Sequence, residues 1–343
     1  MHISPNYFLI FEAGGFIFFI LIVVRKIFQR NWTGIFELVS CAVFGMILEI
    51  GNTYLAHTYS YSPNFLVNLA HVPVAIGLGW SVVIYCAMLL SDQYNLPWTL
   101  RPFMDALTAV ILDVAMDAIA IRLGFWHWAI PLDKEWYGVP FENLVGWILV
   151  VLAFSFLIRF LRTLNHRRTM TKFLMILSPF LSYLGLLVGL AVFSLIAILP
   201  YQINNWASLL QFQYSPDLSI MMNPQVELWK IILFTVIMTE LLHIVVWSLI
   251  KYRHNYLRNF DLVSFTALTG IHLLFLSAIF TQGIYRESLI LAVISVVTLI
   301  IHLIIHLLPY IINRKTVYIF NTVKEATEHG EQRLGEVVKA TLK

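Results

Sequence analysis

Carboxylates stand inside apolar stretches in the first half of the chain. Glu49, Asp113 and Asp117 each lie among residues typical of a membrane-spanning helix. A charge inside a bilayer costs about 2.5–3.5 kcal/mol on insertion scales, so such residues indicate a functional site. Asp113 and Asp117 are four residues apart, which places both on one helical face. Two close carboxylates repel, so at least one should be protonated near neutrality, as general-acid catalysis requires. We predict that all three are catalytic.

A structural role for the acids is the alternative. In that case the acids pair with Arg122, His127 or backbone groups and only lock helices together. A fourth acid, Asp105, follows Pro102 near the inner end of its helix. We expect it to cap that helix or to lie at the interface.

Aromatic and polar residues are frequent around these acids. An interfacial aromatic belt explains some of them. The others predict a pocket whose ring faces stabilise a developing cation while the carboxylates move protons. The predicted substrate-binding residues are Tyr61, His71, Trp80, Trp126, His127, Trp128, Tyr137 and Asn143.

Histidines in the second half of the chain form a separate signal. His302 and His306 are spaced to share one helical face, and Glu240, His243 and His272 lie in the two preceding apolar stretches. Such spacing can bind metal or haem, or serve a proton path. One pair is too few for a di-iron hydroxylase, so we favour hydrogen bonds between helices. We expect neither a metal site nor a cofactor.

The composition predicts the element type that positions these residues. The 343 residues are 59% hydrophobic and 12% charged, with a mean hydropathy of +0.80. Soluble domains average about 45–50% apolar and 25% charged residues, so this chain needs lipid as its solvent. We predict an all-α polytopic membrane bundle, because backbone groups in lipid must be satisfied within each segment. Its nine expected spans are 7–24, 34–55, 72–90, 102–123, 142–161, 173–200, 228–250, 260–282 and 288–311.

The distribution of Lys and Arg predicts the orientation. All but four of the 22 basic residues fall in segments that such a bundle places on one side, which the positive-inside rule makes the cytoplasmic side. The N-terminus is then outside and the C-terminus inside, in a membrane that we expect to be a bacterial inner membrane. The basic run 159–172 should anchor to inner headgroups and divide a front bundle (1–165) from back helices (166–312), which precede a cytoplasmic tail (313–343). The expected partners are membrane lipids and no nucleic acid; the oligomeric state is not predicted.

The order of these motifs resembles a family of membrane carotenoid biosynthesis proteins, of the bisanhydrobacterioruberin hydratase and carotenoid 1′,2′-hydratase type. The resemblance spans about 49–147 and is weaker after 165. Two departures concern the substrate more than the fold: Asp117-Ala118 replaces an expected Asp-Pro, and His71 replaces the glycine of Gly-Val-Pro. The matching segments are 113–117 (DVAMD), 124–128 (GFWHW) and 136–147 (WYGVPFENLVGW), preceded by 49–51 (EIG), 59–61 (YSY), 72–73 (VP) and Trp80.

The resemblance implies a hydro-lyase that adds water, without a cofactor, to a terminal double bond of a carotenoid or other long isoprenoid. Asp117 or Asp113 would supply the proton, and Glu49 or Asn143 would orient water. Two alternatives remain open. One is a family relative that acts on another lipid. The other is a transporter that uses the intramembrane carboxylates as a proton or ion relay, which predicts related halves.

Overall fold

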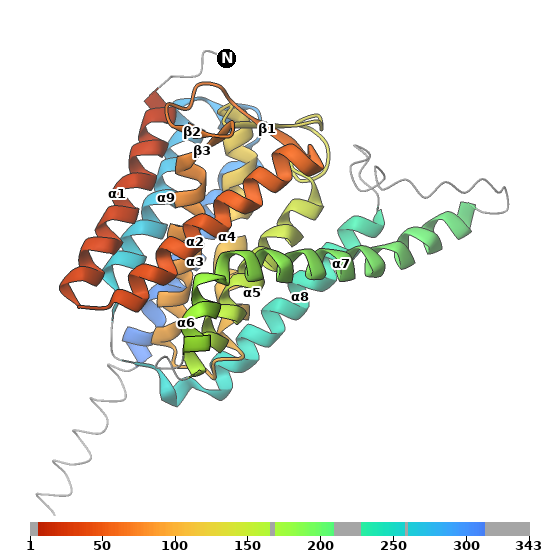
Figure 1. Cartoon of the computed structure of the whole chain (residues 1–343). Coiled ribbons are helices and arrows are strands. Elements are labelled where there is room, and N and C mark those ends of the chain that lie inside the picture. The colour runs from red at the N-terminus through yellow and green to blue at the C-terminus, as the bar shows by residue number, and fades with distance from the viewer. Residues whose placement is uncertain (1–5, 165–168, 209–227, 258–259, 313–343) are drawn as a thin grey trace, which may run out of the picture.

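The computed structural model of the chain describes residues 6–164, 169–208, 228–257 and 260–312. These residues form a bundle of long helices (Figure 1). Eight of the described helices are long and apolar enough to cross a membrane. The prediction of an all-α polytopic membrane bundle is therefore confirmed, while the predicted tail 313–343 lies outside the described residues. The helices are α1 (Asn6–Phe28), α2 (Trp32–Ile50), α3 (Val74–Gln93), α4 (Arg101–Arg122), α5 (Phe141–Thr163), α6 (Thr169–Ile176), α7 (Ser178–Ser208), α8 (Leu228–Lys251), α9 (Leu262–Thr281) and a last helix, Leu289–Ile312.

Each of the nine predicted spans falls on one of these long helices. Helix α4 is continuous but is not among the eight apolar helices, because its sequence contains charged residues. These include Asp105, Asp113, Asp117 and Arg122. All four charged side chains are buried, since α4 packs against α3, α5, α8 and α9. The sixth span begins later than predicted, because the short helix α6 occupies its first residues and α7 starts at Ser178.

Short strands gather at one end of the bundle, at the top of Figure 1. A π-helical turn, η1 (Gly51–Ala56), continues α2 and leads into β1 (Tyr59–Tyr61). Strand β1 pairs antiparallel with β4 (Trp126–Trp128), which follows α4. Strands β2 (Asn68–Leu69) and β3 (Val72–Pro73) form a tight hairpin before α3. Proline precedes both α3 and α5, where its missing N–H costs nothing at a helix start.

The opposite end holds a buried ionic network. Arg159 is 2% exposed and pairs with Asp105 at 2.9 Å and with Asp92 at 2.6 Å, while Arg162 pairs with Glu37 at 2.7 Å. The expectation that this part of the basic run anchors to headgroups is wrong, because both guanidinium groups turn inward onto acids. The expectation for Asp105 is also wrong: it is fully buried, whereas Leu100 is the N-cap of α4.

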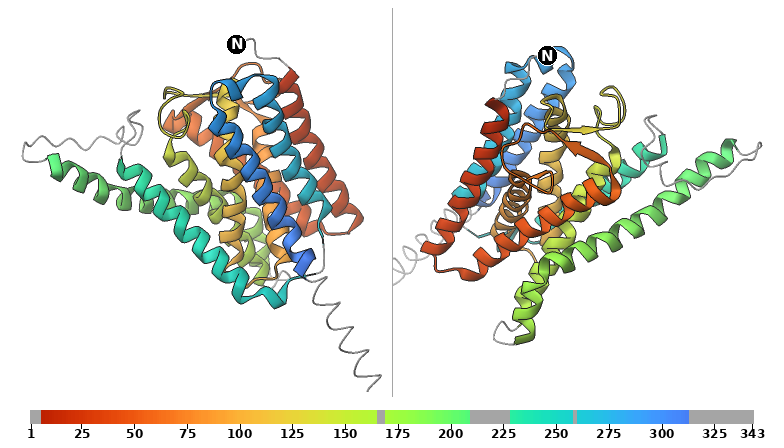
Figure 2. Two further views of the ribbon diagram at one scale, coloured as in Figure 1. Left: turned by 180° about the vertical axis from the view of Figure 1, so that it is seen from behind. Right: turned by 45° about the horizontal axis from the view of Figure 1, so that its top comes forward.

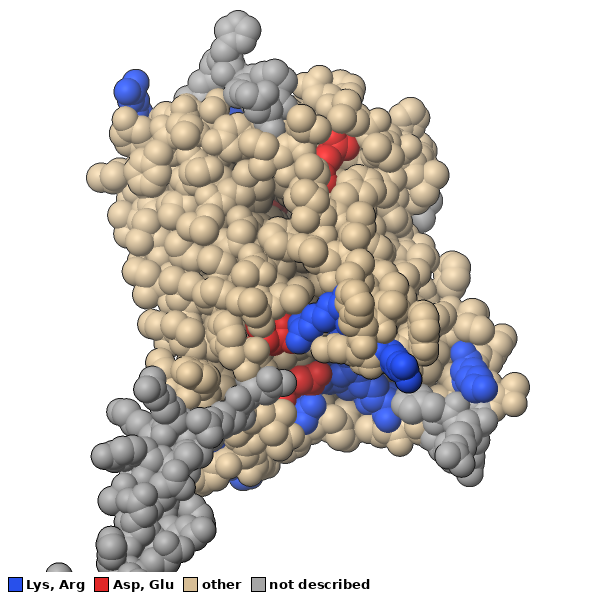
Figure 3. Space-filling model, turned by 90° about the vertical axis from the view of Figure 1, so that its left-hand side faces the viewer, with Lys and Arg blue, Asp and Glu red and all other residues tan. Residues whose placement is uncertain are grey.

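Charged side chains are unevenly distributed over the surface. On the face shown in Figure 3, Lys, Arg, Asp and Glu gather mainly toward the lower end, and uncharged residues cover most of the remainder. Helices α7 and α8 lean away from the other helices (Figure 2) and expose many apolar side chains. This surface suits a lipid environment, and the direction of insertion remains a prediction.

Candidate active site

A cavity of about 330 Å³ lies beneath the strand-bearing end of the bundle. Most of its walls come from α2, α3, α4 and α5, with η1, β1 and β4 covering one end. Phe11 of α1 and three back-helix residues, Leu186, Leu190 and Ile271, complete the wall. The site therefore draws on both of the predicted parts of the chain.

Glu49 forms one side of the cavity and is held by three donors. It accepts hydrogen bonds from the Tyr59 hydroxyl, from the Tyr61 hydroxyl at 2.5 Å and from Trp80 Nε1 at 2.6 Å. Burial, together with the nearby Glu49 carboxylate, raises the pKa of both tyrosine hydroxyls well above 10. Both tyrosines are consequently neutral donors. Three donors on one carboxylate favour its ionised form.

Asp117 forms the opposite side. Its two oxygens accept hydrogen bonds from Trp126 Nε1 and, at 2.5 Å, from Asn143 Nδ2. Asp113 lies one turn earlier, fully buried behind the cavity wall, with Asn143 Nδ2 3.5 Å from its Oδ2. The second oxygen of Asp113 has no hydrogen-bond partner. Asn143 thus connects the two aspartates.

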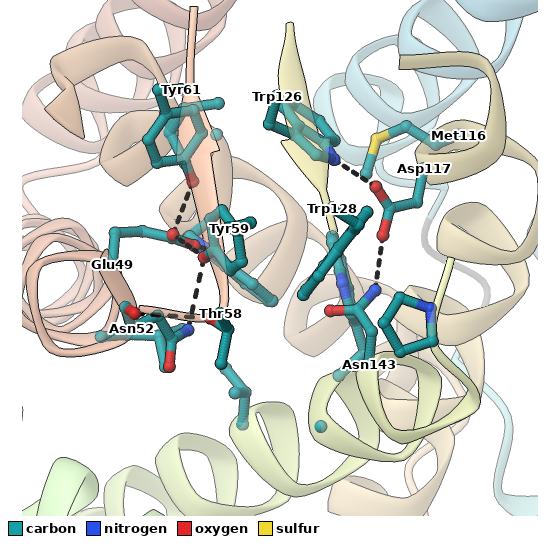
Figure 4. A pocket seen from close by; sticks show the side chains of 18 of the residues that line it. Glu49, Asn52, Thr58, Tyr59, Tyr61, Met116, Asp117, Trp126, Trp128 and Asn143 are labelled. Atoms are coloured by element: carbon teal, nitrogen blue, oxygen red, sulfur yellow. Dashed lines mark hydrogen bonds between the residues drawn. The ribbon is translucent and has the colours of Figure 1, made fainter. Parts of the chain in front are cut away.

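The β1–β4 ribbon joins the two sides of the cavity. Tyr59 pairs with Trp128 and Tyr61 pairs with Trp126, with ring centroids 4.6 and 6.2 Å apart. Alternate residues of a strand point to opposite faces, so all four rings face the cavity and the residues between them point away. Figure 4 shows Glu49 and Asp117 facing one another from the two sides, with these rings between them.

The structure brings together most of the predicted site residues. Glu49, Asp117 and five of the predicted binding residues line the cavity, and Asp113 supports it from behind. Three others do not reach it: His71 and His127 are exposed, and Tyr137 lies in the loop before α5, where its carbonyl accepts from Arg122. His127 points away because it stands between Trp126 and Trp128 on β4. The five binding residues that line the cavity are Tyr61, Trp80, Trp126, Trp128 and Asn143.

The hydrogen bonds of the acids fit part of the predicted structural alternative, because Glu49 bonds to Trp80 of α3 and Asp117 to Asn143 of α5, which joins helices. Within the described residues, neither Glu49 nor Asp113 nor Asp117 forms an ion pair. Arg122, the proposed partner, instead pairs with Glu287 at 2.7 Å. The acids are therefore held by neutral donors, and Glu49 and Asp117 line an open space.

Several cavity residues were not predicted, and Trp147 and Glu142 are two of them. Trp147 stacks on Trp80 with ring centroids 4.1 Å apart. Glu142 also lines the cavity, and Lys230 Nζ lies 2.8 Å from both Glu142 and Glu135. The signal for Trp147 was available, because it follows Asn143 by four residues and so shares its helical face, whereas Glu142 is the direct neighbour of Asn143 and has no such spacing.

The histidines form a separate buried cluster. The His302 ring lies 4.9 Å from that of His272 and 4.2 Å from that of His306, and Thr269 Oγ1 lies 3.2 Å from His302 Nε2. The last contact joins α9 to the last helix, as the helix-packing interpretation predicts. Among the described residues, no three or more side chains of His, Cys, Asp or Glu lie together in a way that could hold a metal ion. Glu240 and His243 lie on an exposed face of α8.

The arrangement suits proton transfer in an apolar space. One carboxylate is fixed by three donors, and the other neighbours a second carboxyl group with an unpartnered oxygen. Indole and phenol rings separate them, and their faces attract a cation. Such a site can give a proton to one side of an apolar molecule and remove a proton at the other.

Comparison with known proteins agrees with the motifs. The chain is 36% identical, over 62 residues, to a bisanhydrobacterioruberin hydratase of Haloarcula japonica; the match covers 17% of this chain and about a fifth of that relative. No solved structure matches significantly. Residues 7–207, more than half of the chain, match the family described as carotenoid biosynthesis protein. The chain therefore belongs to the carotenoid biosynthesis protein family.

Proposed function

We propose that this membrane protein is a hydratase that adds water to a terminal trisubstituted double bond of a carotenoid or similar long isoprenoid. One observation supports this most strongly: Glu49 and Asp117 face one another across an aromatic-walled cavity (Figure 4). Family membership and the partial similarity to a hydratase support the substrate class and the reaction.

The reaction proceeds in two steps. Asp117 gives a proton to the less substituted alkene carbon, forming a C–H bond as the π bond breaks. The tertiary carbocation lies between the ring faces of Trp80, Trp126 and Trp147 and near the anionic Glu49. Water then forms the C–O bond, and its released proton goes to Glu49. The two carboxyl groups return to their initial states when a proton passes from Glu49 to Asp117 through water.

The cavity is large enough for only one end of the proposed substrate. About 330 Å³ is at the small end for ligand pockets and accommodates the reacting end of a long isoprenoid. The remaining chain extends toward lipid, which explains why such a site would lie in a membrane bundle. A family relative acting on another lipid would use the same cavity.

Expression in a host that accumulates an acyclic carotenoid tests the proposal. Mass analysis of the pigments should give a product heavier by one water, and Asp117→Asn should abolish it. The matched control is Asp133→Asn, since Asp133 is exposed in the loop before α5. Unchanged pigments, with the protein present in the membrane, would reject carotenoid hydration and favour another lipid substrate or the transporter alternative.

A further inference from the structure

Two segments that line the cavity contain the same residues at the same spacing. An aromatic-x-aromatic strand, a Val-Pro pair, a Gly-Trp pair and a valine recur 67 residues apart. In the preceding helices, Glu37 and Glu49 match Asp105 and Asp117 with a spacing of 68. The repeated positions are Tyr59/Trp126, Tyr61/Trp128, Val72/Val139, Pro73/Pro140, Gly79/Gly146, Trp80/Trp147 and Val83/Val150.

The backbone repeats with the sequence. Leu69 pairs with Val72 in the β2–β3 hairpin, and the equivalent Trp136 pairs with Val139. The two residues between them have positive φ in both copies, at 51° and 58° in the first and 53° and 89° in the second. Positive φ is uncommon outside glycine. The same unusual turn therefore precedes α3 and α5.

The contacts between the two copies follow twofold symmetry. Tyr59 pairs with Trp128 and Tyr61 with Trp126, so each copy makes the same contact with the other. Reciprocal contacts of this kind characterise an isologous interface. Equivalent residues also meet each other directly at three levels: Ser60 with His127, Trp80 with Trp147 and Asp92 with Arg159. These three levels define an axis through the cavity.

We infer that the cavity is built by an internal duplication, in which Glu49 and Asp117 are equivalent, and that the breaks in its symmetry make the Asp113–Asp117 pair the proton donor. Asp113 occupies the position of Gly45 in the first copy, and Asn143 occupies that of Ile76. A Cβ at Gly45 would lie 2.7 Å from Trp80 Cβ. The first copy therefore has no room for a second acid beside Glu49.

These differences between the two copies give the Glu49 side of the cavity and the Asp113–Asp117 side different charges. Glu49 accepts from the two tyrosine hydroxyls and from the Trp80 indole, which can only donate, and three donors on one carboxylate favour the anion. The unpartnered, buried Asp113 oxygen is tolerated only if that pair of carboxyls keeps a proton, since an unpaired buried charge is too costly. The assignment rests on the proposed function for its use in catalysis, in which Asp117 passes the proton to substrate and Glu49 receives one from water.

The titratable groups that face the aspartate pair are few. Glu49 approaches from α2, Tyr59 and Tyr61 from β1, and Glu142 from α5. On the α9 side, His272 lies beside a separate cavity of about 10 Å³ that it shares with Met116 of α4. Each of these can be replaced singly, so a proton on the pair can be distinguished from one elsewhere.

Infrared spectroscopy of the protein in lipid at neutral pH tests the assignment without substrate. The absorption of protonated carboxyl groups should fall by one group in Asp113→Asn, and should be retained in Glu49→Gln and in the control Asp133→Asn. If Asp113→Asn does not accumulate, Asp117→Asn tests the same shared proton. Loss in Glu49→Gln, or retention in both aspartate variants, would overturn the assignment.

The hydration assay then separates this inference from the proposed function. If the assignment holds, Asp113→Asn should lower the hydration rate at least tenfold and move the alkaline limb of the pH–rate profile, as expected for general-acid catalysis. Glu49→Gln should lower the rate without moving that limb. A wild-type protein with the shared proton but no hydrated product rejects the function and keeps the charge assignment. An unmoved limb in Asp113→Asn, with wild type active, rejects the assignment alone.

Discussion

Glu49 depends on the two tyrosines of β1. The Tyr59 and Tyr61 hydroxyls both donate to this carboxylate, and Asn52 Nδ2 lies 3.3 Å from the Tyr59 hydroxyl. A hydrogen bond to a charged group contributes about 1.5–3 kcal/mol, which corresponds to a rate effect of roughly ten- to hundredfold. By donating to Glu49, the two tyrosines favour the negative charge of the site on that carboxylate.

Replacing Tyr61 by Phe should lower the hydration rate by about ten- to hundredfold, because Glu49 loses one donor while the ring stays in place. The rate is measured by pigment analysis of membranes with equal protein content. Tyr310→Phe is the matched control, since Tyr310 is exposed on the last helix, away from the cavity. Equal rates for the two variants would contradict the role of the hydroxyl.

The tyrosines also predict a pH dependence. Burial raises the pKa of both hydroxyls well above 10, so the protonated donor form persists as the pH rises. If the hydration rate falls between about pH 7 and 10, the pH–rate profile should therefore have the same slope in that range for wild type and for Tyr59→Phe. A limb that disappears in Tyr59→Phe would show that the tyrosine itself titrates in this range.

At the scale of elements, two glycines near the start of α5 have different surroundings. Gly138 has φ +89°, and a Cβ there would lie 2.9 Å from Leu132 Cα. Gly146, on the face of α5 that lines the cavity, has nothing within 4 Å of such a Cβ. The same substitution should consequently have different effects at these two positions.

Gly138→Ala should destabilise the folded protein by about 1–2 kcal/mol, since left-handed backbone penalises a side chain. Gly146→Ala should be neutral or stabilising by roughly 0.5–1 kcal/mol, because alanine favours a helix over glycine. Thermal unfolding of the two purified variants measures the difference. A larger loss of stability in Gly146→Ala would contradict the described turn.

How much the sequence predicts differs between elements. Apolar length predicts the nine helices well, because the length of a span follows from bilayer thickness. The strands were missed: three residues such as 59–61 have no periodicity to distinguish them from a loop. That pairing decides the site, since it turns Trp126 and Trp128 inward and His127 outward. The repeated segments were also missed, because only the transporter alternative predicted a repeat and placed it between the two halves of the chain, whereas these segments both lie within the first half.

At the scale of the whole molecule, charge separates the two ends of the bundle. Long-range ion pairs at the end opposite the strands, such as Arg159–Asp105, could not be predicted, because nothing in a basic run shows which side chains turn inward. Removing one partner of a buried pair costs about 3–5 kcal/mol. Arg159→Met should therefore lower stability by about that amount in thermal unfolding, whereas Lys172→Met should leave it within error. Equal stability would show that Arg159 is not required by the network.

The same charge distribution predicts the orientation in the membrane. With the N-terminus outside and the C-terminus inside, the strand-bearing end and the cavity face outward, and the Arg159 end faces the cytoplasm. A reporter that is active only in the cytoplasm should be active at the C-terminus and inactive at the N-terminus. The opposite pattern would reverse the predicted topology without changing the fold.

The most direct test of hydration follows the oxygen atom of the product. Membranes with the wild-type protein are incubated with an acyclic carotenoid in water enriched in the heavy oxygen isotope, and the product is analysed by mass. The proposal predicts a tertiary alcohol whose oxygen comes from the labelled water, formed equally well without molecular oxygen and absent in Asp117→Asn. An unlabelled hydroxyl, or a product that requires molecular oxygen, would contradict hydration and indicate oxygenation instead.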